Sequence, residues 1–244
     1  MPFNGRPGRL IYLLPNFFTA SSIFAGVLSM ISAVNGSYEK AAWLIMLALV
    51  FDGLDGRVAR LTNTCSKFGV EFDSLADIVA FGAAPAILIY TYVGGDYGRY
   101  GVVVSALFVI FGAVRLARFN VMTAQTEPSV FIGVPIPTAA VFVSVLVLVS
   151  ESYAPLRSAG YIILVAAVAV ALLMVSNIRY PSFKKLDMQA MHMTRFFIAL
   201  IMTALLIFLY PIEGLALLFS LYILYGPLRA LIFLIKRWRL LRKS

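Results

Sequence analysis

Cysteine and histidine are almost missing from this chain of 244 residues, which has one of each, Cys65 and His192. A single cysteine cannot form an intramolecular disulfide, so a disulfide framework is excluded. Structural zinc sites need several Cys or His ligands at characteristic spacing, and one residue of each type cannot supply them. His192 alone likewise cannot anchor a histidine-based metal site.

Charged residues are also scarce. They make up 13% of the chain against 61% hydrophobic residues, and the mean hydropathy is +0.93. Soluble domains carry roughly a quarter charged residues, so this composition predicts a membrane protein. The net charge of +9 could indicate a protein that binds nucleic acid. In so apolar a chain it instead indicates basic loops that face anionic lipid headgroups, and we expect no nucleic-acid partner.

Long apolar runs take up most of the sequence. A membrane-spanning helix needs about 20 mainly apolar residues, and eight stretches qualify: 13–34, 39–61, 72–94, 100–120, 134–151, 158–177, 194–211 and 213–235. We therefore expect an all-α integral membrane protein with about eight transmembrane helices. Sixteen of the 20 Lys and Arg residues lie on one side of these spans. This distribution predicts that both termini face the cytoplasm, and we expect the protein to lie in the cytoplasmic membrane.

Four aspartates interrupt the apolar pattern between residues 51 and 86. Asp52 and Asp55 share a face near the end of the second span, and Asp73 and Asp77 share a face near the start of the third. A turn through "TNTCSKFG" makes these helices antiparallel, so the two pairs can converge on the cytoplasmic side. Four bare carboxylates would repel one another. Divalent cations such as Mg²⁺ resolve this repulsion, and paired cations are a recurring device for displacement at phosphorus.

The small and basic residues around the aspartates suit a phosphorylated ligand. Gly56 and Gly69 remove side chains where such a ligand would approach the backbone, and Arg60 lies one turn beyond Gly56 to meet a phosphate.

The spacing of these residues resembles the signature of the CDP-alcohol phosphotransferase family. The match includes eight fixed positions, which are Asp52, Asp55, Gly56, Ala59, Arg60, Gly69, Asp73 and Asp77. With "RPGRLIYLLPNFFTASSIFAG", "RLARFN" (115–120) and "FIGVPIPTAA" (131–140), the resemblance covers about residues 6–140. Within the family, the chain most resembles the members that use L-serine.

The resemblance implies a domain layout. A basic interfacial segment at 1–12 would precede a six-helix catalytic core at 13–177, followed by a basic cytoplasmic loop at 178–193. Two additional helices at 194–235 and a basic tail at 236–244 would complete the chain, and the sequence gives these helices no catalytic role. The resemblance also implies a homodimer.

The resemblance also implies a site. Asp52, Asp55 and Asp73 would bind two divalent cations, Mg²⁺ or Mn²⁺, and Asp77 would complete the metal site and act as the general base. Two groups would contact the nucleotide: Gly56, Ala59 and Gly69 in the cytidine pocket, and Asn16 and Thr19 from the first helix. The implied reaction transfers the phosphatidyl group of CDP-diacylglycerol, a membrane lipid, to the hydroxyl of L-serine and releases CMP.

The serine pocket is a hypothesis from chemistry and placement. Arg115 and Arg118 could bind the serine carboxylate, Asn120 could add a hydrogen bond, and Glu71 could receive the ammonium. The alternatives are that both arginines anchor to headgroups and that Glu71 is a solvated charge at a helix N-terminus.

Two other functions compete with serine transfer. The acceptor could be glycerol-3-phosphate or an inositol phosphate, whose extra phosphate would require a denser set of cations. A divalent-cation transporter would also use buried carboxylates, but it should place them mid-membrane. The predicted position of the aspartates near the helix ends favours an enzyme.

Overall fold

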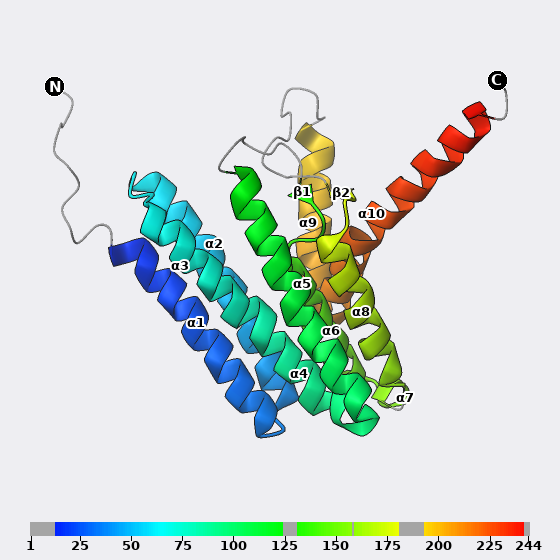
Figure 1. Ribbon diagram of the computed structural model, residues 1–244, viewed down its shortest axis with the longest axis horizontal. Coiled ribbons are helices and arrows are strands. Elements are labelled where there is room, and N and C mark those ends of the chain that lie inside the picture. The colour runs from blue at the N-terminus through cyan, green and yellow to red at the C-terminus, as the bar shows by residue number, and fades with distance from the viewer. Residues whose placement is uncertain (1–12, 124–130, 158, 181–192, 242–244) are drawn as a thin grey trace.

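The computed structural model describes residues 13–123, 131–157, 159–180 and 193–241 (Figure 1). The predicted interfacial segment at 1–12, the loop residues 181–192, which include His192, and the tail residues 242–244 lie outside the described residues. The described chain is almost entirely helical, so the all-α fold class is confirmed. The start of α1, the α2–α3 turn and the end of α10 lie at the same end of the bundle (Figure 1).

The helices follow the eight predicted spans. They are α1 (Leu13–Val34), α2 (Tyr38–Leu61), the rod formed by α3 (Lys67–Asp77), η2 (Ile78–Ala83) and α4 (Ala84–Tyr92), α5 (Arg99–Thr123), α6 (Ile136–Ser152), α8 (Tyr161–Val175), α9 (Met193–Leu209) and α10 (Pro211–Leu241). Short turns η3 (Gly94–Tyr97) and α7 (Ala154–Arg157) connect them, and β1 (Phe131–Ile132) pairs antiparallel with β2 (Arg179–Tyr180).

Four of the described helical segments are long and apolar enough to cross a membrane: Leu13–Val34, Lys67–Tyr92, Arg99–Met122 and Pro211–Phe233. Shorter apolar helices cover Ile136–Ser152, Tyr161–Val175 and Leu200–Leu209. Although α2 has 24 residues, its last three turns carry the charged residues Asp52, Asp55, Arg57 and Arg60. It therefore combines a spanning length with a polar end.

Small residues allow the first helices to pack closely. Ser29 Oγ donates to the Ala41 carbonyl at 2.8 Å, and Ser22 Oγ donates to the Ala48 carbonyl at 3.2 Å, so α1 and α2 are joined by hydrogen bonds as well as by contact. Gly26 of α1 faces η2, where a Cβ at position 26 would lie 2.8 Å from the Ala80 Cα. Close backbone approach through small residues is the usual way in which membrane helices associate.

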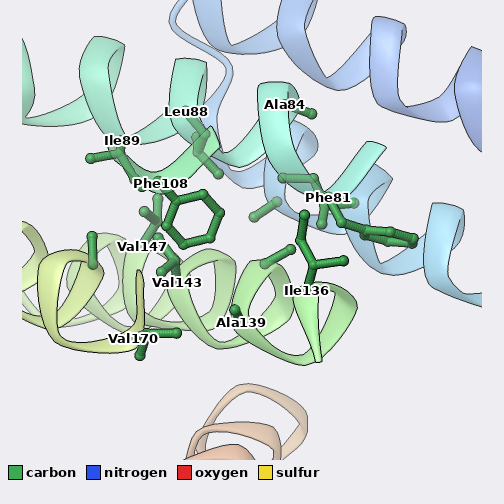
Figure 2. Close-up of a cluster of buried hydrophobic side chains, with 14 of the residues drawn as sticks. Phe81, Ala84, Leu88, Ile89, Phe108, Ile136, Ala139, Val143, Val147 and Val170 are labelled. Atoms are coloured by element: carbon green, nitrogen blue, oxygen red, sulfur yellow. The ribbon is translucent and has the colours of Figure 1, made fainter. Parts of the chain in front are cut away.

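A proline explains the wide π turn of η2. Pro85 has no N–H to donate to the Phe81 carbonyl, and its ring would clash with that carbonyl in a regular α-helix. The preceding turn widens instead, and the Ala84 N–H donates to the Val79 carbonyl. The Phe81 side chain is fully buried. It lies in the core with Leu88 of α4, Phe108 of α5 and Ile136 of α6 (Figure 2).

The close contact at Gly26 makes a prediction about stability. Gly→Ala in a helix interior is intrinsically favourable by about 1 kcal/mol, but at position 26 the methyl group overlaps backbone atoms of Ala80. We expect Gly26→Ala to lower the thermal unfolding midpoint, because overpacking costs about 1–3 kcal/mol. The matched control is Gly53→Ala in α2, where a Cβ meets nothing within 4 Å. Circular dichroism in detergent measures both, and equal midpoints would contradict the prediction.

Candidate active site

The turn between α2 and α3 is fixed by two capping motifs. Asn63 takes a left-handed conformation (φ 53°), while the Thr64 N–H donates to the Ala59 carbonyl at 3.0 Å and the Asn63 N–H donates to that of Arg60 at 3.4 Å. This is the Schellman pattern that ends a helix. Ser66 then caps α3 and accepts from the Gly69 N–H at 3.0 Å. The cap starts α3 at Lys67, five residues before the predicted start of the third span.

The antiparallel pair brings the aspartates together, as the spacing predicted. Asp52 and Asp55 from α2 and Asp73 from α3 each offer a carboxylate oxygen, and these oxygens all lie within 4.8 Å of one another. Asp77 lies one turn further along α3 and shares a side-chain hydrogen bond with Asp52. Asp55 and Asp77 are buried, at 6% and 8% exposure.

Helix α1 orients one of these carboxylates. The Thr19 hydroxyl lies 2.7 Å from Asp55 Oδ2 and 3.2 Å from the Pro15 carbonyl, so it can donate to either oxygen. Thr19 was predicted to contact a nucleotide. The structure places it beside the carboxylate cluster as well, where a donor of this kind fixes the direction of a ligating group.

Two carboxylate oxygens in the cluster are buried without a hydrogen-bond partner among the described residues, Asp73 Oδ1 and Asp77 Oδ1. An unsatisfied buried carboxylate oxygen is costly. Hard divalent cations take oxygen ligands of this kind and accept several carboxylates around one site. The residues present therefore fit a divalent cation.

A cavity of about 190 Å³ opens beside the cluster. Its walls come from α1, the end of α2, the turn and the start of α3, and include eight of the predicted residues: Asn16, Thr19, Asp55, Gly56, Ala59, Arg60, Gly69 and Asp73. The sequence analysis missed Pro15, Thr64, Cys65, Ser66 and Val70 in this lining. Residues 64–66 could have been inferred from the turn itself, since it joins the two helices that carry the aspartates.

The two glycines of the cavity wall lie next to polar side chains. A Cβ at Gly56 would lie 3.7 Å from the Arg60 guanidinium, and a Cβ at Gly69 would lie 3.2 Å from Ser66 Oγ and 3.8 Å from Asn16 Oδ1. Larger side chains at these positions would therefore fill the space that the neighbouring polar groups border.

The two arginines predicted to bind serine have different environments. Arg118 donates from Nη1 to the Val175 carbonyl and Asn177 Oδ1, and from Nη2 to the Ile132 and Ser176 carbonyls, at 3.1–3.3 Å. Its four terminal N–H groups therefore have acceptors at the end of α8 and in β1. Arg115 is buried, its guanidinium carbon lies 5.1 Å from the centre of the Phe119 ring, and its charge interacts electrostatically with Asp77.

The other two residues of the predicted serine pocket are also separated. Asn120 Nδ2 donates to Ser74 Oγ at 2.8 Å, which ties the end of α5 to α3 beside Asp73. Glu71 is exposed and is not part of the cavity lining. The structure thus brings Arg115 and Asn120 near the aspartates, but not the Arg118 terminal N–H groups or Glu71.

Comparisons with known proteins agree with this geometry. Residues 12–175 match the family model described as CDP-alcohol phosphatidyltransferase. The chain is 50% identical over 231 residues to the CDP-diacylglycerol–serine O-phosphatidyltransferase of Helicobacter pylori, which covers 94% of this chain and 96% of that protein.

Two shorter alignments extend the comparison. The chain is 41% identical over 170 residues to the archaetidylserine synthase of Methanothermobacter thermautotrophicus, covering 69% of each protein. It is 33% identical over 172 residues to the CDP-diacylglycerol–serine O-phosphatidyltransferase of Bacillus subtilis, covering 70% of this chain and 92% of that protein. The resemblance that the aspartate spacing indicated is therefore confirmed, and the chain belongs to the CDP-alcohol phosphatidyltransferase family of integral membrane proteins.

Proposed function

We propose that this protein transfers the phosphatidyl group of CDP-diacylglycerol to the hydroxyl of L-serine, forming phosphatidylserine and releasing CMP. The observation that carries the proposal is the convergence of three aspartates beside a cavity, with Asp77 hydrogen-bonded to one of them, Asp52. The relatives at 50% identity over nearly the whole chain, which are named for the serine reaction, support the choice of acceptor.

The cavity between α1, α2 and α3 would hold the nucleotide. Gly56, Ala59 and Gly69 leave room for cytidine, Asn16 offers a hydrogen-bonding amide, and the Arg60 guanidinium at the rim meets a phosphate. The four aspartates would bind two divalent cations, Mg²⁺ or Mn²⁺, which would neutralise the diphosphate and the charge that grows on the leaving CMP.

Asp77 would act as the general base. It takes the proton from the serine hydroxyl as the hydroxyl oxygen bonds to the phosphorus that carries diacylglycerol. The bond between that phosphorus and the oxygen bridging to CMP breaks, and CMP leaves. Burial of Asp77 keeps bulk water from competing with serine for the base.

Arg115 would bind the serine carboxylate. It is a buried guanidinium beside Asp77, with no hydrogen bond to any residue that the structure describes, so its N–H groups can pair with a carboxylate. Asn120 can border the same space from the end of α5. Arg118 instead holds the backbone of β1 and α8. The role of Glu71 as the ammonium partner stays a prediction.

We further propose that the site and both termini face the cytoplasm, as the Lys and Arg distribution predicts. The carboxylates lie close to the α2–α3 turn at one end of the bundle, within reach of a water-soluble acceptor and product. This position favours the enzyme over a transporter with a mid-membrane site. The homodimer that the family resemblance implies also stays a prediction.

An acceptor panel tests the proposed function. Purified protein with CDP-diacylglycerol and Mn²⁺ should release CMP with L-serine, but not with glycerol-3-phosphate or an inositol phosphate. Asp77→Asn should lower turnover by about 10²–10⁴-fold because the base is lost. Asp96→Asn, an exposed aspartate in η3, is the control that should keep full activity. Release with glycerol-3-phosphate and none with serine would overturn the acceptor assignment.

Cys65 offers a test of metal and nucleotide binding that does not depend on turnover. It is the chain's single cysteine, it is exposed and it lines the cavity. We expect CDP-diacylglycerol to slow maleimide labelling of Cys65 when Mn²⁺ is present, and EDTA or Asp52→Asn to remove this protection. Asp96→Asn should retain it. Protection that persists in EDTA and in Asp52→Asn would mean that the aspartates do not bind a cation for the nucleotide.

The two arginines should respond differently to substitution by lysine. Arg115→Lys should raise the KM for serine about tenfold or more, because lysine cannot offer two parallel donors to a carboxylate. Arg118→Lys should lower the thermal unfolding midpoint instead, because backbone carbonyls lose their donors. Steady-state kinetics and circular dichroism on both variants check this, and a normal serine KM in Arg115→Lys would remove Arg115 from the serine site.

A further inference from the structure

A side-chain hydrogen bond joins α3 to α5 next to the aspartates. Ser74 follows Asp73 directly and precedes Asp77 by three residues, so Ser74 and Asp77 share a face of α3. Ser74 thus lies about 4.5 Å along the helix axis from the proposed base. Near the end of α5, Asn120 Nδ2 donates to Ser74 Oγ at 2.8 Å. Both residues are half-buried. The contact therefore brings an amide from α5 to the aspartate-bearing part of α3.

The hydrogen bonds of Ser74 decide which way the Asn120 amide faces. A serine hydroxyl has one proton to donate, and Ser74 Oγ donates it to the Val70 carbonyl at 3.0 Å, one turn earlier in α3. With its proton used there, Ser74 Oγ accepts from Asn120. The amide nitrogen therefore faces Ser74, and the amide oxygen lies on the other branch of the side chain. Because the last torsion of asparagine is broad and roughly two-fold, such partners determine which group faces which neighbour.

The contact lies outside the wall of the cavity proposed for the nucleotide. That cavity is lined by α1, the end of α2, the turn and the first residues of α3 as far as Asp73. In a displacement at phosphorus the attacking and leaving oxygens lie roughly in line, so the acceptor needs a space separate from that of the departing nucleotide. Ser74 Oγ instead contacts α5, the helix that also carries Arg115, for which we proposed the carboxylate of the acceptor.

We propose that Ser74 is a positioning residue for the acceptor, because its hydroxyl holds the Asn120 amide in one orientation, one turn from Asp77, where the amide binds the acceptor. The inference rests on the proposed function, which places the acceptor between α3 and α5. Ser74 need not touch the acceptor, since it acts through Asn120. The sequence analysis gave Ser74 no role.

Steady-state kinetics on Ser74 variants tests the inference. Ser74→Ala should raise the serine KM about fivefold, the size expected for one lost hydrogen bond, while kcat and the KM for CDP-diacylglycerol stay within twofold of the wild type. Alanine is the strongest helix former, so this variant should keep its unfolding midpoint. Ser74→Thr retains the hydroxyl and should keep the serine KM within twofold.

Ser21→Ala is the matched control. Ser21 of α1 makes the same local bond as Ser74, since its hydroxyl donates to the carbonyl four residues earlier, that of Phe17, at 2.8 Å. Among the described residues, the Ser21 hydroxyl has no partner on another helix. The control therefore loses the same backbone contact without affecting α5, and it should change neither KM.

A double variant shows whether Ser74 acts through Asn120. Asn120→Ala should itself raise the serine KM, because the amide is removed. If the two residues work as one unit, adding Ser74→Ala should change the KM of Asn120→Ala by less than twofold. A further rise of twofold or more would mean that Ser74 acts independently of the amide, and the inference would be wrong.

The outcomes separate this inference from the proposed function. The wild-type acceptor panel tests the function, whereas the ratio of acceptor KM between Ser74→Ala and wild type tests the inference, for whichever acceptor is used. A ratio of two or less would overturn it, and so would a Ser74→Thr KM as high as that of Ser74→Ala. A parallel loss of affinity for both substrates, together with loss of Cys65 protection by CDP-diacylglycerol, would also overturn it, because Ser74 would then be merely structural.

Discussion

The mutual repulsion of four carboxylates in a confined, poorly hydrated space governs the rest of this structure. Asp52, Asp55, Asp73 and Asp77 can lie together only if cations or donors balance them, and two of their oxygens have no donor among the described residues. Thr19 supplies one donor, to Asp55. The arrangement therefore fits a bound cation, and the helices around it hold the carboxylates at positions that they would not adopt unaided.

A second constraint is the need to satisfy backbone groups in helices that lie in lipid. At Pro85 the preceding turn of the helix widens. Pro227 of α10 has no N–H for the Ile223 carbonyl, and the Tyr180 hydroxyl donates to that carbonyl instead. At the end of α8 and in β1, Arg118 donates to three carbonyls. These are three solutions to one problem. Two of them, at Arg118 and Tyr180, also connect the bundle that carries the aspartates to the C-terminal helix.

The fold and the aspartate cluster could be predicted because their signals are local. Apolar runs give the spans, and the i, i+3 and i, i+4 spacing gives a shared face on each of two helices. The two arginines could not be distinguished in this way, since both lie on one turn of α5 and only the distant carbonyls of Ile132, Val175 and Ser176 separate their roles. The close contact between Gly226 of α10 and the Tyr180 ring was equally invisible in the sequence, because Tyr180 lies 46 positions earlier in the chain.

The wide turn of η2 divides one rod into two surfaces. An α-helix rotates by about 100° per residue, so the looser winding between Ile78 and Ala83 offsets the faces on either side of it. Upstream, α3 directs Asp73 and Asp77 toward charged neighbours, while downstream α4 presents Leu88 and Ile89 to an apolar interior. One continuous helical rod can thus line a polar site at one end and pack against an apolar interior at the other.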